Sequence, residues 1–159
     1  MNVEELTDRL EIADVLYRFA AGIDGRDWAL YRSVFTDEFE LDYSSYRPEN
    51  HGRWRADDWA ARAASLFPGL DGTQHAITNM RIDLDGDGAR VRADVRADHV
   101  VIADGITRVY TVVGAYDDHL VRTAGGWRIA RKCLRMRWSE GDAAIMQVAR
   151  DRVAAATTG

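Results

Sequence analysis

Two residues of this chain, Asp24 and His75, have side chains that could together remove a proton from a substrate. Asp24 lies in the segment Gly-Ile-Asp-Gly-Arg-Asp-Trp, and His75 lies in Thr-Gln-His-Ala-Ile-Thr-Asn. A carboxylate that holds one imidazole nitrogen orients the ring and stabilises its protonated form, so the other nitrogen can act as a general base. Neither segment requires that residue type in order to fold. We therefore expect a catalytic Asp24–His75 pair if the fold brings the two side chains together.

The elements that must position this pair are a helix and a strand. Apolar residues recur at spacings of three and four through residues 4–22, which predicts an amphipathic helix that ends at Gly22. Asp24 follows this end directly. His75 comes just before residues 77–84, which are predicted to form a strand that ends at the Asp-Gly-Asp-Gly turn.

Two further helices and one strand are expected in the first half of the chain. Asp27 can cap a second short helix. A third helix should begin at residue 57 or 58 and continue to Phe67, where Pro-Gly stops it. Alternating apolar and acidic residues predict a short strand over 39–43. The polar residues 44–54 are expected to form a loop.

The second half of the chain is typical of long antiparallel strands. Apolar and polar residues alternate there, and Gly-containing turns separate the segments. Strands are expected over 89–102, 106–120 and 127–138, and a helix or loose tail over 141–155.

Helices followed by a meander of strands indicate an α+β fold. A strongly curved antiparallel or mixed sheet wrapped around the helices would form a cone-shaped barrel with an internal pocket. The length of 159 residues fits one domain. We place its core at about residues 4–142 and a C-terminal helix or tail at 143–159.

Composition excludes several classes of partner. Apolar residues make up 47% and charged residues 30%, with a formal net charge of −5. Arginines alternate with acidic residues and form no basic block, so nucleic acid is not an expected partner. The first residues show no basic patch followed by an apolar core, so a secretory signal is not expected, and no apolar run is long enough to span a membrane. The chain is therefore expected to be cytoplasmic and not to bind membranes.

Metal binding is also not expected. The single cysteine, Cys133, excludes an internal disulfide and a cysteine-based zinc site. The four histidines lack metal-ligand spacing. Asp-Gly-Asp-Gly at 85–88 lacks the further oxygen ligands of a calcium loop and is better explained as a hairpin turn.

The order of three segments resembles the SnoaL-like branch of the nuclear-transport-factor-2-like superfamily. These segments are Gly-Ile-Asp-Gly-Arg-Asp-Trp, Gln-His-Ala-Ile-Thr-Asn and Gly-Gly-Trp-Arg-Ile-Ala. That branch includes scytalone dehydratase, a bile-acid dehydratase and polyketide cyclases. The resemblance implies an α+β barrel with a closed apolar pocket, no cofactor, a small hydrophobic ligand and self-association as a dimer or trimer.

The resemblance also implies roles for individual residues. Asp24 and His75 match the paired aspartate and histidine base of the dehydratases, Tyr43 matches a pocket tyrosine, and Asp98 matches a second pocket carboxylate. Two positions depart from the family pattern. Phe19 occupies a slot that often holds tyrosine or lysine, and the expected arginine on the last strand falls nearest Met136.

Strand alternation gives a partly different set of pocket residues. His75 and Asn79 have the same parity, so both should face the pocket if that face is concave. Adjacent Asp98 and His99 should point to opposite faces, and alternation places His99 with the apolar residues. Resemblance favours Asp98, and both remain candidates. Phe19, Tyr43, Met136 and Trp138 are further candidates for the lining.

The expected function is a cofactor-independent lyase of the dehydratase type. His75, oriented by Asp24, would remove a proton from an activated carbon of a small hydrophobic or polycyclic substrate, and a leaving group would then depart. A polyketide cyclase or a double-bond isomerase would use the same pair. A non-catalytic small-molecule-binding or oligomerisation module is the alternative of another class.

Overall fold

The computed structural model describes residues 2–158, and its first element is the helix α1, Val3–Gly25. Asn2 and Glu5 form a capping box at its start. The helix continues three residues beyond Gly22, so the predicted end was wrong. Gly22 is buried against α2, and a Cβ at this position would overlap the backbone of Tyr31. The glycine therefore permits close helix packing, and Arg26, with a φ of 58°, ends the helix.

The short elements that follow fold back against α1. Asp27 caps α2, Trp28–Ser33, by accepting a hydrogen bond from the backbone N–H of Leu30 at 2.9 Å. Strand β1, Phe35–Asp42, pairs with β2, His51–Arg55. Strand β2 overlaps the last part of the segment predicted to be a loop, so that prediction was wrong for residues 51–54. Its side chains are mostly exposed, as expected at the edge of a sheet, and so its sequence lacks an apolar pattern.

The remaining elements match the expected order. Helix α3, Ala56–Ala64, is followed by the 3-10 turn η1, Phe67–Gly69. The long strands come next, and the chain ends in a helix. The four long strands are β3, Gly72–Asp85; β4, Gly88–Ala103; β5, Ile106–Thr123; and β6, Gly126–Gly141. The C-terminal helix is α4, Ile145–Thr157.

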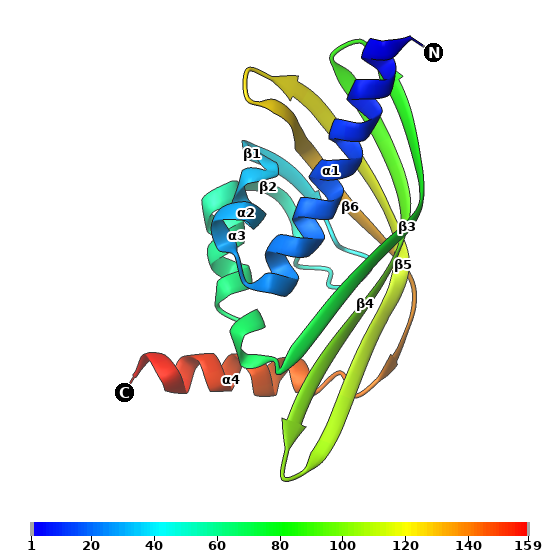
Figure 1. The fold of residues 1–159 in the computed structure, drawn as a ribbon. Helices are drawn as coiled ribbons and strands as arrows, with labels where there is room; N and C mark the ends of the chain where they lie inside the picture. Colours follow the sequence, from blue (N-terminus) through cyan, green and yellow to red (C-terminus); the bar gives the residue numbers. More distant parts are fainter. Residues whose placement is uncertain (1, 159) are drawn as a thin grey trace.

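The six strands form one mixed sheet in the order β2-β1-β6-β5-β4-β3. Strand β1 pairs in parallel with β6, and the other neighbours are antiparallel. The sheet curves strongly but does not close into a barrel. Figure 1 shows α1 crossing its concave side, with α2 and α3 beside it and α4 at one end. The predicted cone-shaped α+β fold is confirmed, with an open sheet in place of a closed barrel.

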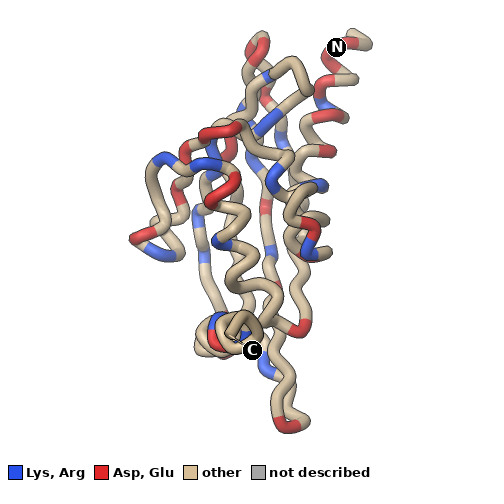
Figure 2. Tube along the Cα trace, turned by 90° about the vertical axis from the view of Figure 1, so that its left-hand side faces the viewer, with Lys and Arg blue, Asp and Glu red and all other residues tan. Residues whose placement is uncertain are grey.

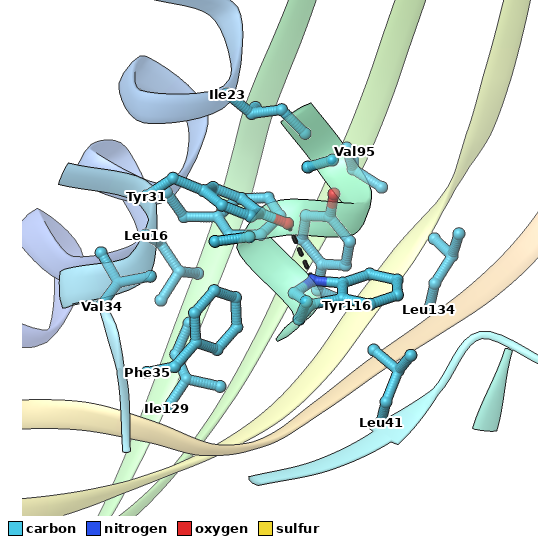
Figure 3. Packing of buried hydrophobic residues seen from close by; sticks show 14 of the residues in the cluster. Leu16, Ile23, Tyr31, Val34, Phe35, Leu41, Val95, Tyr116, Ile129 and Leu134 are labelled. Atoms are coloured by element: carbon cyan, nitrogen blue, oxygen red, sulfur yellow. Dashed lines mark hydrogen bonds between the residues drawn. The ribbon is translucent and has the colours of Figure 1, made fainter. Parts of the chain in front are cut away.

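The core lies between α1 and the concave face of the sheet. Ile12, Val15, Leu16 and Phe19 place the buried stripe of α1 there. Figure 3 shows Tyr31 and Tyr116 among aliphatic side chains from both sides of this core. Burial of these side chains fixes the depth at which α1 lies, and therefore the place where its C-terminal turn meets β3.

Basic and acidic side chains are interspersed along the chain (Figure 2), consistent with the alternation in the sequence. No helix within residues 2–158 is long and apolar enough to span a bilayer.

Candidate active site

A cavity of about 130 Å³ lies between the concave sheet face and the helices. Helices α1–α4, the turn η1, the segment between β1 and β2, and strands β3–β6 all contribute to its lining. Most of the lining is apolar or aromatic: Phe19, Ile23, Tyr31, Tyr43, Tyr46, Trp59, Ala63, Leu66, Phe67, Val95, Ala97, Val112, Tyr116, Leu134 and Met146. The polar lining residues are Arg47, Asn50, Arg62, His75, His99 and Arg150.

Asp24 and His75 meet at this cavity. The Nδ1 atom of His75 lies 2.7 Å from Oδ1 of Asp24, and the backbone N–H of His75 donates to Oδ2 at 2.7 Å. Thr73 adds a hydroxyl that donates to Oδ1 at 3.0 Å. The His75 side chain is only 7% exposed. The carboxylate thus holds both the ring and the backbone of the residue it orients.

Arg26 links the end of α1 to the start of β3. Its backbone N–H caps α1, and its guanidinium donates to the carbonyl of Ile23 and to the hydroxyl of Thr73, each at 2.8 Å. This link connects the turn that carries Asp24 to the strand that carries His75. The position of the pair is therefore determined by the backbone of both elements.

The protonation states of the pair follow from these contacts. Burial raises the pKa of the Asp24 carboxyl, but the hydrogen bonds and charge of His75, together with the Thr73 hydroxyl, outweigh burial and lower this pKa below its ordinary value. An ionised carboxylate can only accept hydrogen bonds. His75 must therefore carry a proton on Nδ1, which leaves Nε2 of the neutral ring unprotonated and able to act as a base.

A second imidazole, His99, lies beside the first. The two ring centroids are 5.8 Å apart and the rings are nearly perpendicular. His99 is 5% exposed, and its Nδ1 lies 3.1 Å from the carbonyl oxygen of Tyr110. Burial and the neighbouring His75 lower the pKa of His99 to about 4. His99 is therefore neutral at pH 7, and because the carbonyl only accepts, Nε2 is its free acceptor.

Three of the four tyrosines that line the cavity, Tyr31, Tyr43 and Tyr116, have hydroxyl groups bonded to other side chains of the wall. Trp59 donates from Nε1 to the hydroxyl of Tyr31 at 2.9 Å. Tyr43 and Tyr116 are hydrogen bonded through their hydroxyls, and burial raises the pKa of both. All three phenols therefore remain protonated at neutral pH.

A buried ion pair, which the sequence analysis missed, lies behind this wall. Lys132 and Asp118 are both fully buried, with Nζ 2.7 Å from Oδ2. The Lys132 ammonium lies 3.2 Å from the ring centroid of Tyr116 and 4.3 Å from that of Phe19. Burial lowers the pKa of Lys132 and raises that of Asp118. The alternation of β6 was the available signal, because it places residue 132 on the same face as Leu134.

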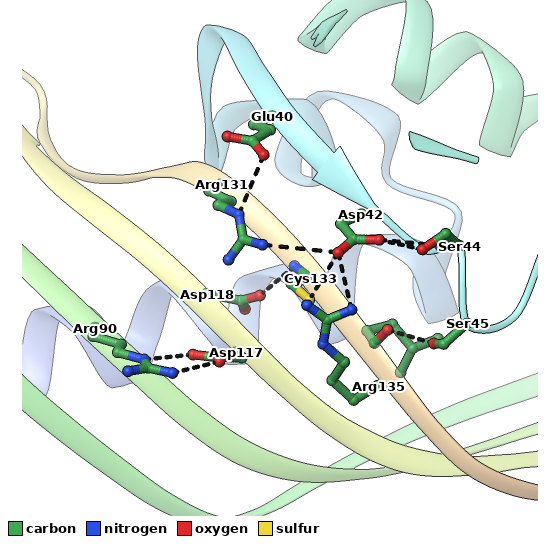
Figure 4. Close-up of polar contacts among 11 residues, drawn as sticks. Glu40, Asp42, Ser44, Ser45, Arg90, Asp117, Asp118, Arg131, Cys133 and Arg135 are labelled. Atoms are coloured by element: carbon green, nitrogen blue, oxygen red, sulfur yellow. Dashed lines mark hydrogen bonds and ion pairs between the residues drawn. The ribbon is translucent and has the colours of Figure 1, made fainter. Parts of the chain in front are cut away.

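Adjacent aspartates on β5 face opposite sides of the sheet. Figure 4 shows Asp117 bound to Arg90 on the outer side, whereas Asp118 accepts from the backbone of Cys133. Asp42 joins Arg135 at 3.0 Å in the same outer network. The outward arginines are thus neutralised locally by carboxylates. Among residues 2–158 no group of three or more potential metal ligands gathers.

Comparison with known proteins gives the family. Residues 4–132 match the SnoaL-like domain. The chain belongs to the SnoaL-like family. The Terrestric acid biosynthesis cluster protein E of Penicillium crustosum is 28% identical, over 88% of this chain and 90% of that protein.

Solved structures show the same SnoaL-like fold. A protein of Kribbella flavida is 32% identical with a TM-score of 0.81, over 92% of this chain and 99% of that one. The hexachlorocyclohexane dehydrochlorinase LinA-type3 of Novosphingobium barchaimii has a TM-score of 0.73 at 18% identity, over 90% of this chain and 95% of that one. At that identity the likeness shows the fold alone.

Two of the residues expected in the pocket, Asn79 from strand parity and Asp98 from the resemblance, lie elsewhere because of strand geometry. Asn79 sits at a register shift between Thr78 and Arg81 with a φ of 52°, and its amide donates to Asp94 at 2.7 Å on the exposed surface. The shift breaks the parity that would have placed Asn79 with His75.

Asp98 also lies outside the cavity. Strand β4 pairs with β5 without a bulge, so Asp98 and His99 point to opposite faces. Asp98 accepts from Thr111 at 2.6 Å and from Arg96 at 3.2 Å. Of the two candidates, His99 is the one that lines the cavity.

The last strand departs from expectation as well. Trp138 is 53% exposed, and neither it nor Met136 lines the cavity, although Met136 packs against the core. The nearest lining residue on β6 is Leu134. The cation on the inner face of this strand is Lys132, close to Phe19. Phe19 and Tyr43 both line the cavity.

Proposed function

We propose that this SnoaL-like protein is a cofactor-independent lyase that eliminates water or another leaving group from a small hydrophobic or polycyclic substrate. The proposal rests on one observation: the 2.7 Å contact between His75 and Asp24 at the buried end of an apolar cavity. Membership of the SnoaL-like family supports an enzyme of the dehydratase or isomerase type. His75 would be the base, and Asp24 its orienting partner.

The elimination step can be written with these residues alone. Nε2 of His75 takes a proton from a carbon next to a carbonyl group, and Asp24 stabilises the imidazolium that forms. The phenols of Tyr43 and Tyr116 lie in the same cavity and share one hydrogen bond, so the hydroxyl that accepts this bond is the one left to donate to the enolate oxygen. When the C–O bond at the next carbon breaks, His75 returns its proton to the departing hydroxide, and water leaves. Neutral His99 can accept a hydrogen bond from the substrate.

Two other reactions begin with the same proton removal. A cyclase or a double-bond isomerase also forms an enolate first, and then forms a C–C bond or returns the proton elsewhere. A non-catalytic binding or oligomerisation module would form no enolate. Deuterium uptake from D₂O at the acidic carbon of aryl β-hydroxy ketones therefore separates the enzyme readings from the non-catalytic one. Formation of the conjugated enone then identifies the lyase.

The test compares three variants with the wild-type protein. His75→Ala removes the base and is expected to lower the deuterium-exchange rate about 10²–10⁴-fold. Asp24→Asn is expected to cost about as much, because an amide opposite the ring favours the wrong tautomer. His119→Ala, at an exposed histidine, is the matched control and should retain the full rate. Equal rates in wild type and His75→Ala would refute the proposal.

A further inference from the structure

The charge of the cavity lining has one sign. Three arginines, Arg47, Arg62 and Arg150, line the cavity, and no aspartate or glutamate does. The chain as a whole has five more acidic than basic residues. The Asp24 carboxylate lies behind His75 and does not line the cavity, so the charged side chains that the lining presents to a ligand are all positive.

The three guanidinium groups come from different elements. Arg47 lies between β1 and β2, Arg62 on α3 and Arg150 on α4. They therefore converge on the cavity through the tertiary structure, and no run of basic residues predicts them. Arg62 is exposed, and Arg47 and Arg150 are partly exposed. Because His75 and His99 are nearly buried, the arginines mark the outer end of the cavity and the imidazoles its inner end.

Within residues 2–158, none of these arginines is closely paired with a carboxylate. Arg47 has only a 4.0 Å approach to the exposed Glu49. Arg62 donates to the amide oxygen of Asn50 at 2.8 Å, and Arg150 reaches the carbonyl of Met146 at 3.5 Å. This differs from Arg32, Arg90 and Arg122, which each hold a carboxylate at 2.6–2.8 Å.

Asn50 adds a neutral donor at the same end. It is 7% exposed and lines the cavity. Because Arg62 donates to its Oδ1, the amide nitrogen Nδ2 is the remaining polar atom, and no residue within 2–158 accepts from it. Nδ2 is not among the buried unpaired polar atoms of the described residues, so it is accessible and free to donate. The missing acceptor fits an oxygen atom supplied by a ligand.

We propose that the ligand of this cavity is a small carboxylate: a single-ring apolar body in the inner part and a carboxylate group held by Arg47, Arg62, Arg150 and the amide of Asn50 at the mouth. This rests on the proposed function only in taking the ligand to be the substrate of His75. A planar guanidinium matches a carboxylate with two parallel hydrogen bonds. The cavity of about 130 Å³ is close to the size of about 150 Å³ that accommodates benzene in another protein.

Matched acids and amides provide the test. Phenylacetate, cinnamate and 3-phenylpropanoate are each titrated against the protein by calorimetry, alongside the corresponding neutral amide. We expect each acid that binds to do so about tenfold or more tightly than its amide, since hydrogen bonds to charged groups are the stronger ones. Raising the salt concentration should weaken the acids and leave the amides unchanged.

Variants assign the preference to the mouth of the cavity. The Arg47→Gln/Arg150→Gln double variant should bind acid and amide within about threefold of each other. Arg53→Gln is the control, because Arg53 is exposed on β2 and does not line the cavity; it should retain the wild-type preference. Circular dichroism confirms that each variant is folded. Equal binding of acid and amide by the wild-type protein, no binding of any acid, or a preference that survives the double variant would each overturn the proposal.

This outcome is separable from that of the proposed function. The three acids carry no β-hydroxyl group, so their binding does not depend on turnover. If the protein prefers acids but shows no His75-dependent deuterium exchange, the carboxylate site is supported and the proposed lyase activity is refuted. If deuterium exchange occurs on neutral ketones but acids are not preferred over amides, the lyase activity is supported and the carboxylate site is refuted.

Discussion

Lys132 is fully buried in a part of the molecule that excludes water. Its partner Asp118 is equally buried, and the pair lies directly behind the rings of Phe19 and Tyr116. Two charges in such a place are costly to desolvate, and each depends on the other for compensation. The pair therefore fixes the position of one lining residue, because Lys132 holds the ring of Tyr116 against the inner face of β6.

Replacing only Lys132 of the buried pair should destabilise the protein far more than replacing both Lys132 and Asp118. Lys132→Met leaves Asp118 buried with the backbone N–H of Cys133 as its remaining donor, and we expect a loss of about 3–5 kcal/mol in the free energy of unfolding. The Lys132→Met/Asp118→Asn double variant should recover most of that loss. Urea unfolding followed by tryptophan fluorescence measures both. A single variant as stable as the wild-type protein would contradict this account.

At the scale of elements, the site depends on how closely α4 packs against η1. Gly69 lies in this contact, where a Cβ atom would overlap the backbone of Ala149. The same helix brings Met146 and Arg150 to the cavity. The small size of one residue in η1 therefore sets the position of two lining residues on α4.

Gly69→Ala should move α4 away from the cavity. Overpacking of this kind costs about 1–3 kcal/mol, and here the obstacle is backbone, which cannot rotate aside. We expect a lower melting temperature, faster amide exchange in α4 and weaker binding of the test carboxylates. Gly25→Ala is the control, since no heavy atom lies within 4 Å of a Cβ at that position. Unchanged amide exchange in α4 would show that the helix tolerates the added methyl group.

At the scale of the whole molecule, burial of His99 links stability to pH. Its pKa is about 4 in the folded protein, against about 6.5 in the unfolded chain. Between these values the unfolded chain binds more protons, so stability rises with pH and falls on acidification. The contribution is fully present above pH 6.5 and is lost as the pH falls through 4.

We expect His99 to account for about 2–3 kcal/mol of the decrease in unfolding free energy between pH 7 and pH 4. Unfolding by urea at a series of pH values measures this slope. His99→Asn keeps a donor for the carbonyl of Tyr110 and removes the titrating group, so its slope between pH 6.5 and 4 should be much smaller. The pKa of Asp24 is lowered in the folded protein, so the stability that its ionised form contributes is lost only at pH values below this range. An identical slope in wild type and His99→Asn would exclude His99 as the cause.

The sequence by itself determined the order of elements and most of the strand faces. Periodicity predicted α1 and the four long strands, Asp27 was recognised as a cap, and the alternation of β4 placed His99 inward. These signals are local, because they depend on side chains a few residues apart. The sequence also showed that Asp24 lies at the end of a predicted helix and His75 at the start of a predicted strand.

Only the tertiary structure decided what meets in the cavity. The register shift at Asn79, the edge strand β2 and the helical continuation through Gly22 each depend on a partner distant in sequence. The buried Lys132 and the three arginines at the mouth came from segments whose composition gave no reason to group them. Contacts across a folded chain depend on long-range packing, and a local pattern contains no information about which distant residue will complete it.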